Sequence, residues 1–520
     1  MPPDLDARVA RRLAQLDEAR VPQRIWAKDP SVWKDDPDTP EIRDRLGWLT
    51  VADTMAARVE TLEAFADDVR TRFSRVVLCG MGGSSLAPEV LRRTFGVFRG
   101  FPSLVVLDST DPRAVAAAVP AGDVERTLFL VSSKSGTTLE VDSFFRYFWQ
   151  LTGGRGSQFV AITDRDTALA DLAAERGFHR SFLNPSDIGG RYSALSYFGL
   201  VPAALIGVDV GRLLQGARSM AGACAAAVPA RDNPAVGLGA MLGEAALAGR
   251  DKATFVLSPS IASFGLWAEQ LIAESKGKEG KGILPVAEEP LGPPEVYGHD
   301  RLFISLTLAG DEDRETASRL RALSGAGHPV VHLTLEDRYD LGAEFFRWEF
   351  ATAVAGAILG VNPFDQPNVA ESKAGTAAVL EHSTAPSAAA SGAQLKEFLA
   401  AIKPGDYLAV MAYLPPTPDS DRRLAAIRTR LRDRLKVAIT LGYGPRLLHS
   451  TGQLHKGGPA VGHFLQITEE ASEDIAIPGQ AFTFGAMEAA QAEGDLLALR
   501  KRGRPALRLE GLELLTASAA

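Results

Sequence analysis

Short apolar runs alternate with helical stretches along much of the chain. Four β-rich runs follow one another between residues 75 and 163: RVVLCG (75–80), SLVVLD (103–108), TLFLVSS (127–133) and QFVAIT (158–163). The segments between them, LAPEVLRRTF, PRAVAAAV and TLEVDSFFRYFWQL, have helical patterns. Strands that alternate with helices at this spacing predict parallel βαβ units, and hence an open sheet covered on both faces.

The same pattern restarts in the middle of the chain. A helix is predicted over residues 233–249, and further helices near 262–275, 312–324 and 341–359. Three strands are predicted between them, over residues 253–258, 302–308 and 329–335. This second α/β layer system is similar in size to the first, so we expect two related domains.

The two ends of the chain differ from this middle part. Residues 1–70 have helical periodicity, and the patch HSTAPSAAASGAQ (382–394) has the composition of a linker. Apolar runs beyond it indicate a third, smaller α/β unit that finishes in a helix near 483–494. The fold class is therefore predicted to be α/β, with two doubly wound parallel-sheet domains. We expect an N-terminal helical segment (1–70), a first domain (71–228), a second domain (229–390) and a C-terminal α/β unit (391–520).

Composition narrows the classes of protein that remain. The chain has 520 residues, of which 46% are hydrophobic and 23% charged, as in ordinary globular proteins with two to four domains. Its net charge is −8 and the sequence contains no long block of basic residues, which argues against nucleic acid as a partner. No apolar run is long enough to cross a membrane, and the N-terminus lacks the apolar region of a signal peptide. Two cysteines cannot build a disulfide framework or a thiolate metal cluster, and a cytoplasmic location fits.

Two polar loops follow predicted strands of the first domain. They are CGMGGSSLAP (79–88) and SSKSGTTLE (132–140), and ligands of open α/β sheets bind at this end of the strands. Glycines allow close approach, and unpaired N–H groups at the next helix favour an anion. We predict a phosphate site with the donors Gly83, Ser84, Ser133, Lys134, Ser135, Thr137 and Thr138. The alternative is that the hydroxyls only cap a helix. Neither loop has the glycine spacing of a dinucleotide fingerprint or a P-loop.

Five motifs then carry a resemblance to a known family. SSKSGTTLE resembles the phosphosugar-binding motif of the sugar isomerase (SIS) domain. GMGGSSLAPEVL, DIGGRYSALS (187–196), AESKGKEGKG (273–282) and NPFDQPNVAESK (362–373) occur in the order seen in phosphoglucose isomerases. The similarity is closest to the isomerase half of transaldolase–phosphoglucose isomerase fusions. It implies two SIS domains that interconvert glucose 6-phosphate and fructose 6-phosphate through a cis-enediol(ate), in glycolysis and gluconeogenesis. It further implies a homodimer that needs no cofactor and no metal.

The resemblance also assigns roles to single residues. Glu274 matches the carboxylate that moves a proton between C1 and C2; the alternative is a helix-end carboxylate paired with Lys276 or Lys278. Arg191, preceded by Gly190, matches the arginine that stabilises the enediolate. Gln366 is expected to contact sugar hydroxyls, and Lys373 to protonate the ring oxygen as the ring opens.

Two positions depart from the pattern of the family. Ala370 stands where many members have a glutamate, which changes the support of Lys373. The histidine that helps to open the ring is replaced by Arg301, and His299 lies two residues before it. Either His299 fills this role or another group does. A polar loop of the third unit, LLHSTGQLHKGGP (447–459), carries His449 and His455, which either reach the sugar or have a structural role.

Other functions remain open at this point. The same phosphate loop suits another 6-phosphorylated or sulfonated aldose, including dual use of glucose and mannose 6-phosphate. It also suits a phosphosugar-binding sensor without catalysis.

Overall fold

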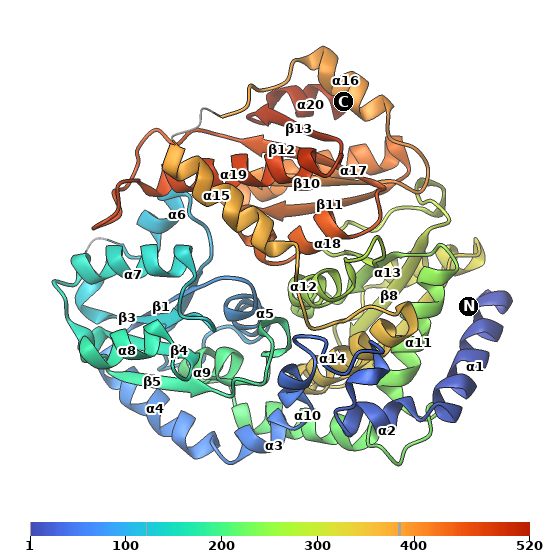
Figure 1. Cartoon of the computed structure of the whole chain (residues 1–520), viewed down its shortest axis with the longest axis horizontal. Coiled ribbons are helices and arrows are strands. Elements are labelled where there is room, and N and C mark those ends of the chain that lie inside the picture. Colours follow the sequence, from blue (N-terminus) through green and yellow to red (C-terminus); the bar gives the residue numbers. More distant parts are fainter. Residues whose placement is uncertain (1, 121, 383–385, 520) are drawn as a thin grey trace.

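The computed structural model describes residues 2–120, 122–382 and 386–519. Within these residues the strands form three sheets, which surround the centre of the molecule in Figure 1. Every pair of neighbouring strands in them is parallel. The predicted α/β class with parallel sheets is therefore confirmed.

The first sheet has the order β2-β1-β3-β4-β5. Its strands are β1 (Arg75–Gly80), β2 (Ser103–Leu107), β3 (Thr127–Ser132), β4 (Phe159–Asp164) and β5 (Arg180–Asn184). Helices α5 (Leu86–Phe95), α6 (Pro112–Ala117), α7 (Leu139–Leu151), α8 (Ala168–Glu175) and α9 (Tyr197–Leu205) follow them. Both faces are buried, since Val76 and Leu78 belong to one apolar cluster and Val77 and Cys79 to another. Strand β5 was not predicted, because its RSFLN sequence alternates polar and apolar residues over only five positions.

The second sheet has the order β7-β6-β8-β9. Its strands are β6 (Lys252–Leu257), β7 (Leu284–Val286), β8 (Arg301–Leu308) and β9 (Val330–Leu335). Its helices are α10 (Val210–Ala223), α11 (Pro234–Leu247), α12 (Phe264–Lys276), α13 (Arg314–Gly325) and α14 (Leu341–Leu359). The predicted strands and helices of this unit are confirmed to within a few residues, but the three-residue β7 was too short to be recognised. Helix α12 is buried along nearly all of its length and lies near the centre of Figure 1.

The third sheet has the order β11-β10-β12-β13. Its strands are β10 (Tyr407–Tyr413), β11 (Ala438–Tyr443), β12 (Gly462–Thr468) and β13 (Ala506–Glu510). Helices α15 (Val369–His382), α16 (Gly392–Ala400), α17 (Pro418–Leu435), α18 (Gly452–Gly457), α19 (Phe484–Lys501) and α20 (Glu513–Ala519) accompany it. The prediction that this unit finishes in a helix near 483–494 is wrong, because β13 and α20 follow α19. The arginine inside ALRLE hides that strand, although the fold buries Arg508.

The predicted linker at 382–394 is described only in part. Residues 383–385 lie outside the described residues, residues 386–391 form neither helix nor strand, and α16 begins at Gly392.

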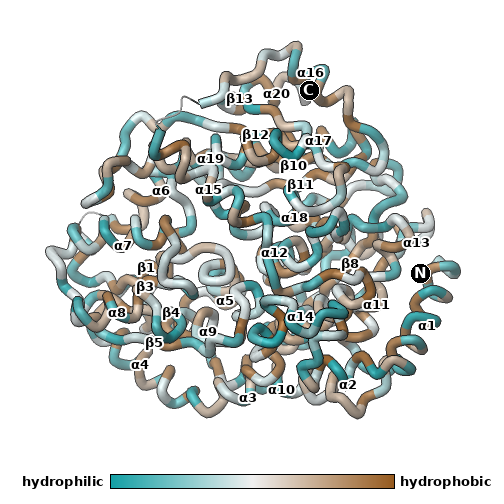
Figure 2. Tube along the Cα trace, in the orientation of Figure 1, coloured by the Kyte–Doolittle hydropathy of each residue, from teal (hydrophilic) through white to brown (hydrophobic). Residues whose placement is uncertain are grey.

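The N-terminal segment is helical, with α1 (Pro3–Glu18), α2 (Val21–Trp26), α3 (Val51–Ala56) and α4 (Val59–Arg72). Helix α1 packs on α11, α3 on α10 and α4 on α9, so this segment contacts both of the first two units. One apolar cluster joins it to both sheets, and Figure 2 shows hydrophobic stretches along the strands and the helices between them. Among the described residues, we find no helix with the length and apolar character needed to cross a membrane.

Candidate active site

The loop between β3 and α7 holds the predicted phosphate donors. Ser133 Oγ lies 2.9 Å from Thr138 Oγ1 and accepts a hydrogen bond from the Gly136 N–H at 3.2 Å. The Ser135 hydroxyl oxygen accepts from both the N–H and the hydroxyl of Thr137, at 3.3 and 3.1 Å. Ser135 and Thr137 are exposed, whereas Ser133 is buried. The loop is therefore shaped by its own hydroxyls and still presents two of them to solvent.

These hydroxyls do not serve as a helix cap. Thr138 is the N-cap residue of α7, and its side chain makes no capping hydrogen bond. The first-turn N–H groups of α7 are consequently left without that partner, at the positive end of a helix of thirteen residues. Lys134 lies at the same loop, where its Nζ is 2.5 Å from Asp164 Oδ2. Capping alone therefore does not explain this cluster of donors, whose exposed hydroxyls and N–H groups are of the kind that suit an anion.

The two glycine-containing turns of the first unit touch each other. The turn Gly82–Ser84 follows β1, and the turn Gly190–Tyr192 precedes α9. A Cβ atom on Gly83 would lie 2.0 Å from the carbonyl oxygen of Gly190, so only glycine allows this approach. Trp48 stacks on Tyr192, the last residue of the second turn, with ring centroids 5.3 Å apart. The backbone that carries Arg191 is thus packed at both of its neighbours, Gly190 and Tyr192.

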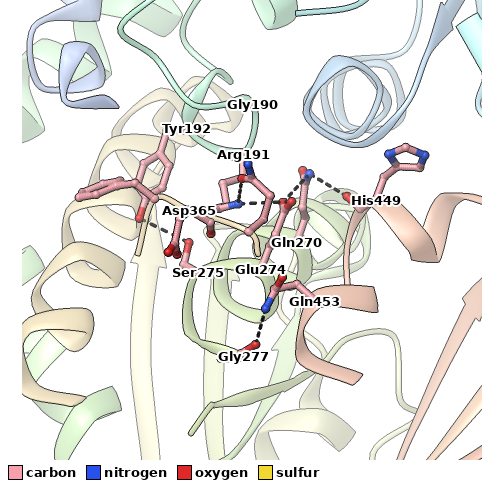
Figure 3. A network of polar contacts seen from close by, with 12 residues as sticks. Gly190, Arg191, Tyr192, Gln270, Glu274, Ser275, Gly277, Asp365, His449 and Gln453 are labelled. Atoms are coloured by element: carbon pink, nitrogen blue, oxygen red, sulfur yellow. Dashed lines mark hydrogen bonds and ion pairs between the residues drawn. The ribbon is translucent and has the colours of Figure 1, made fainter. Parts of the chain in front are cut away.

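Arg191 is buried and contacts Glu274, the predicted base (Figure 3). Its Nη1 donates to Gln366 Oε1 at 3.0 Å and lies 3.3 Å from Glu274 Oε1. Its Nη2 donates to the carbonyl oxygens of Asp365, at 2.7 Å, and Pro363, at 3.1 Å. A planar guanidinium suits such a set of acceptors, and lysine could not hold them all. The structure therefore brings Arg191, Glu274, Gln366 and the Gly190 turn together.

Glu274 lies in the last turn of α12, with 8% of its surface exposed. Gln270, one helical turn earlier, donates from Nε2 to Glu274 Oε2 at 3.1 Å and to the carbonyl oxygen of His449 at 2.9 Å. The alternative of pairing with Lys276 or Lys278 is wrong. Lys276 bonds to the carbonyl oxygen of Thr352, and Lys278 to Asp365 Oδ1 at 2.5 Å.

The two lysines after Glu274 are both buried, and burial disfavours their positive charge. Burial, with the charge of Arg191 next, lowers the pKa of Lys278 to about 8, although Asp365 opposes the shift. Burial also lowers the pKa of Lys276 well below its ordinary value. Arg191, at 3.3 Å from Glu274, is therefore the group whose charge favours a negative oxygen at this place, as an enediolate has.

Lys373 lies on α15 and lines a cavity of about 220 Å³. Thr137 of the phosphate loop, Glu140 at the start of α7, and His449 and Gln491 of the third unit share this cavity. His449 Nε2 is 2.9 Å from Glu140 Oε1, and Gln491 Nε2 donates to the same oxygen at 2.7 Å. Burial by itself would raise the pKa of Glu140, but its attraction to His449 and Lys373 outweighs burial and lowers that pKa. Glu140 thus keeps the charge that orients His449.

The structure does not bring His299 to this site, and that prediction is corrected. His299 is exposed and precedes β8; its carbonyl oxygen accepts from Arg250 at 2.8 Å, and its ring faces His328 with centroids 6.4 Å apart. Arg301, at the position of the expected histidine, is buried in an ion pair with Glu289 at 3.2 Å. Of the two histidines in loop 447–459, His455 is fully buried away from this cavity and His449 is at it.

Other contacts at this site could be found only in part from the sequence. Gln270 stands four residues before Glu274 and so on the same face of α12, which a helical reading would reveal. Glu140 and Gln453 gave no such signal, because their partners are distant in the sequence. Gln453 donates from Nε2 to Gly277 O at 2.9 Å (Figure 3). The same nitrogen donates to Asn368 Oδ1 at 2.7 Å. It thereby ties the end of α12 to the start of the helix that carries Lys373.

The His, Cys, Asp and Glu side chains of the described residues do not form a cluster suited to a metal ion. In residues 2–120, 122–382 and 386–519, no group of three or more His, Cys, Asp or Glu is placed to hold a metal ion. Cys79 and Cys224 are both buried and free.

Comparison with known proteins agrees with these features. The family model described as phosphoglucose isomerase matches residues 50–283. Glucose-6-phosphate isomerase of Rubrobacter xylanophilus is 30% identical over 388 residues, which are 64% of this chain and 88% of the relative. The enzyme of that name from Leptospira interrogans is 28% identical over 387 residues, 65% of this chain and 87% of the relative.

Solved structures share the fold. A glucose-6-phosphate isomerase from Chlamydia trachomatis superposes with a TM-score of 0.60 and 21% identity, over 74% of this chain and 88% of that one. A hypothetical protein from Thermus thermophilus gives a TM-score of 0.61 and 24% identity, over 74% of this chain and 98% of that one. From the family model and the relatives together, this chain belongs to the phosphoglucose isomerase family.

Proposed function

We propose that the protein interconverts glucose 6-phosphate and fructose 6-phosphate through a cis-enediolate. The observation that carries the proposal is the buried contact of 3.3 Å between Arg191 and Glu274, beside a loop suited to phosphate. Family membership and the names of the relatives support the same reaction.

In this proposal each group has one task. The phosphate lies against the hydroxyls and N–H groups of the loop between β3 and α7. Glu274 removes the proton from C2 of the open-chain aldose and returns it to C1, while the O2 hydroxyl loses a proton and the C1 carbonyl oxygen gains one. Arg191 lies beside the carboxylate and stabilises the negative oxygen that forms between the two transfers. Gln366, bonded to Arg191, is placed for contact with a sugar hydroxyl.

Ring opening needs a donor for the ring oxygen and an acceptor for the anomeric hydroxyl proton. Lys373 and His449 share one cavity with Thr137, so both lie beside the proposed phosphate position. We assign Lys373 as the donor and His449, oriented by Glu140, as the acceptor. His449 therefore replaces His299 in the proposed mechanism.

A coupled assay that reports glucose 6-phosphate formed from fructose 6-phosphate tests the reaction. We expect turnover by the wild type and its loss in Glu274→Gln, with substrate binding retained. Glu279→Gln is the matched control, because Glu279 is an exposed acid five residues away that pairs with Lys34. Binding of both sugar phosphates without turnover in the wild type would refute the isomerase proposal and leave a sensor.

The remaining expectations belong to this proposal. Resemblance to the family is the basis for proposing a homodimer that acts in the cytoplasm. Light scattering on the purified chain should give about twice the mass of 55.4 kDa, and a monomer mass would contradict it.

A further inference from the structure

A second and larger cavity lies in the third unit, apart from the one that Lys373 lines. Its volume is about 550 Å³, and Tyr413, Thr468 and Glu510 place it at the carboxyl ends of β10, β12 and β13. In the order β11-β10-β12-β13, the chain goes from β10 to β11 on one side, and from β12 to β13 on the other. The connections that leave the neighbouring strands β10 and β12 therefore run in opposite directions, which makes the crevice between their carboxyl ends a topological switch point. Ligands of open parallel sheets bind at this point, and the volume is in the range of small-molecule sites.

Three buried polar atoms in the lining have no hydrogen-bond partner among the described residues. They are the Tyr413 hydroxyl, Glu488 Oε1 and Arg508 Nη2. The exposed fractions of these residues are 2%, 7% and 4%. Buried polar groups in proteins usually have a hydrogen-bond partner, and leaving one unsatisfied is unfavourable. Three such unsatisfied atoms at the lining of one cavity indicate a ligand that supplies their missing hydrogen-bond partners.

The charge of the cavity selects among ligands. The described lining residues include the acids Glu469, Glu470, Asp474, Glu488 and Glu510 and the cation Arg508, and Arg113 pairs with Glu469 from outside the lining. Arg508 is already engaged, with Nη1 at 2.7 Å from Glu493 Oε2 and Nε donating to Gln466 Oε1 at 2.7 Å. Burial first, and then the nearby Asp111, raise the pKa of Glu488 to about 8. A bound ammonium beside Glu488 would bring this pKa down again and leave the carboxylate charged, and the other acids of the lining attract a cation and repel a phosphate.

The geometry and charge point to one class of ligand: we propose that this cavity binds a small, unphosphorylated amine that also carries hydroxyl groups. Its ammonium donates to Glu488 and to the oxygen of Tyr413, and it is attracted by the carboxylates at the rim. A hydroxyl oxygen accepts from Arg508 Nη2. Ala486 and Ala489, on one face of α19, offer small apolar surface for the carbon skeleton.

Calorimetric titration of the full chain at pH 7, in a buffer free of amines and phosphate, tests this proposal. Three probes of one shape differ in charge: glucosamine, glucose and glucuronate. We expect glucosamine to bind about tenfold or more tightly than glucose, and glucuronate least, because a hydrogen bond to a charged group is worth about 1.5–3 kcal/mol. Equal affinity for the three probes, or no binding of glucosamine up to about 10 mM, would overturn the proposal.

Variants locate the site. Glu488→Gln should weaken glucosamine binding about tenfold or more, and Tyr413→Phe by several-fold. Glu473→Gln, an exposed acid outside the cavity lining, is the matched control and should bind as the wild type does. Unchanged binding in Glu488→Gln, or loss of binding in Glu274→Gln instead, would refute this location.

The test is independent of the proposed isomerase activity. Glu488→Gln should keep wild-type turnover of fructose 6-phosphate, and Glu274→Gln should keep glucosamine binding. Either proposal can therefore fail while the other stands.

Discussion

Gly83 offers a direct test of how the two turns at the active site depend on each other. An added Cβ would meet the Gly190 carbonyl oxygen at 2.0 Å, whereas Cβ atoms in proteins essentially never approach closer than 3.0 Å. The obstacle is backbone, which cannot rotate away as a side chain can. Gly83→Ala must therefore separate the turn Gly82–Ser84 from the turn Gly190–Tyr192 by about 1 Å or more.

The size of the effect follows from this displacement. Arg191 is the next residue after Gly190, and its Nη1 is 3.3 Å from Glu274 Oε1. Moving one partner by about 1 Å breaks that contact, and a misplacement of this size can lower a rate about 100-fold. We expect kcat/KM to fall by that factor, which corresponds to about 2.7 kcal/mol of transition-state stabilisation. Overpacking should cost a further ~1–3 kcal/mol of folding stability.

The coupled isomerase assay and thermal unfolding measure both quantities on one preparation. Gly237→Ala is the matched control, since Gly237 lies within helix α11 and its added Cβ meets no atom within 4 Å. That variant should keep wild-type kcat/KM. If Gly83→Ala unfolds as the wild type does and its kcat/KM stays within about threefold, the steric argument is wrong.

Three further predictions concern charge. Arg191→Lys keeps the positive charge but loses the planar guanidinium with its several fixed donors, so kcat should fall about 100-fold or more in the coupled assay, with a smaller change in KM. An unchanged kcat would contradict the role of the guanidinium geometry. Burial raises the pKa of Glu269 to about 8 from an ordinary 4.5, so the folded state holds a proton that the unfolded state releases, and stability should fall as the pH rises from about 5 through 8. Urea unfolding should show a shallower fall in Glu269→Gln, and identical pH profiles would refute that assignment. Arg446→Met leaves the buried Asp108 without its ion-pair partner at 2.7 Å, and we expect urea unfolding to show a loss of about 3–5 kcal/mol in the free energy of unfolding. Adding Asp108→Asn to that variant removes the unpaired charge and should recover part of the loss.

Most of the sheet framework was predictable, and the reason is burial. Strands such as TLFLVS and LFISLTL are buried along nearly all of their length, so they appear as mostly apolar runs with Ser and Thr as their only polar residues. The elements that were missed, β5, β7 and β13, are short or carry polar residues. Arg508 in β13 is buried because Glu493 pairs with it, and such a pairing cannot be seen in a single strand.

A candidate site could be predicted where one loop carries the donors, but not where distant segments of the chain meet. The hydroxyl-rich stretch before α7 indicates anion binding by itself. The roles of Glu274 and Lys373 came from resemblance, and a resemblance says nothing of a position where the chain departs from the pattern. His299 was chosen for its closeness in sequence to the expected place. His449 lies 309 residues from its partner Glu140, and only the fold brings them together.

Each of the three sheets contributes to the active site in a different way, and this makes the contacts between units part of the chemistry. The first unit supplies loops at the carboxyl ends of β1 and β3, and the second supplies the last turn of α12. The third supplies the loop after β11 that carries His449. Contacts from that loop and from α18, such as Arg446 with Asp108 and Gln453 with Gly277, hold the third unit to the other two. Since Gln270 bonds both to Glu274 and to the backbone of His449, a shift of the third unit reaches the proposed base through one side chain. The third unit is therefore expected to govern both ring opening and the position of Glu274.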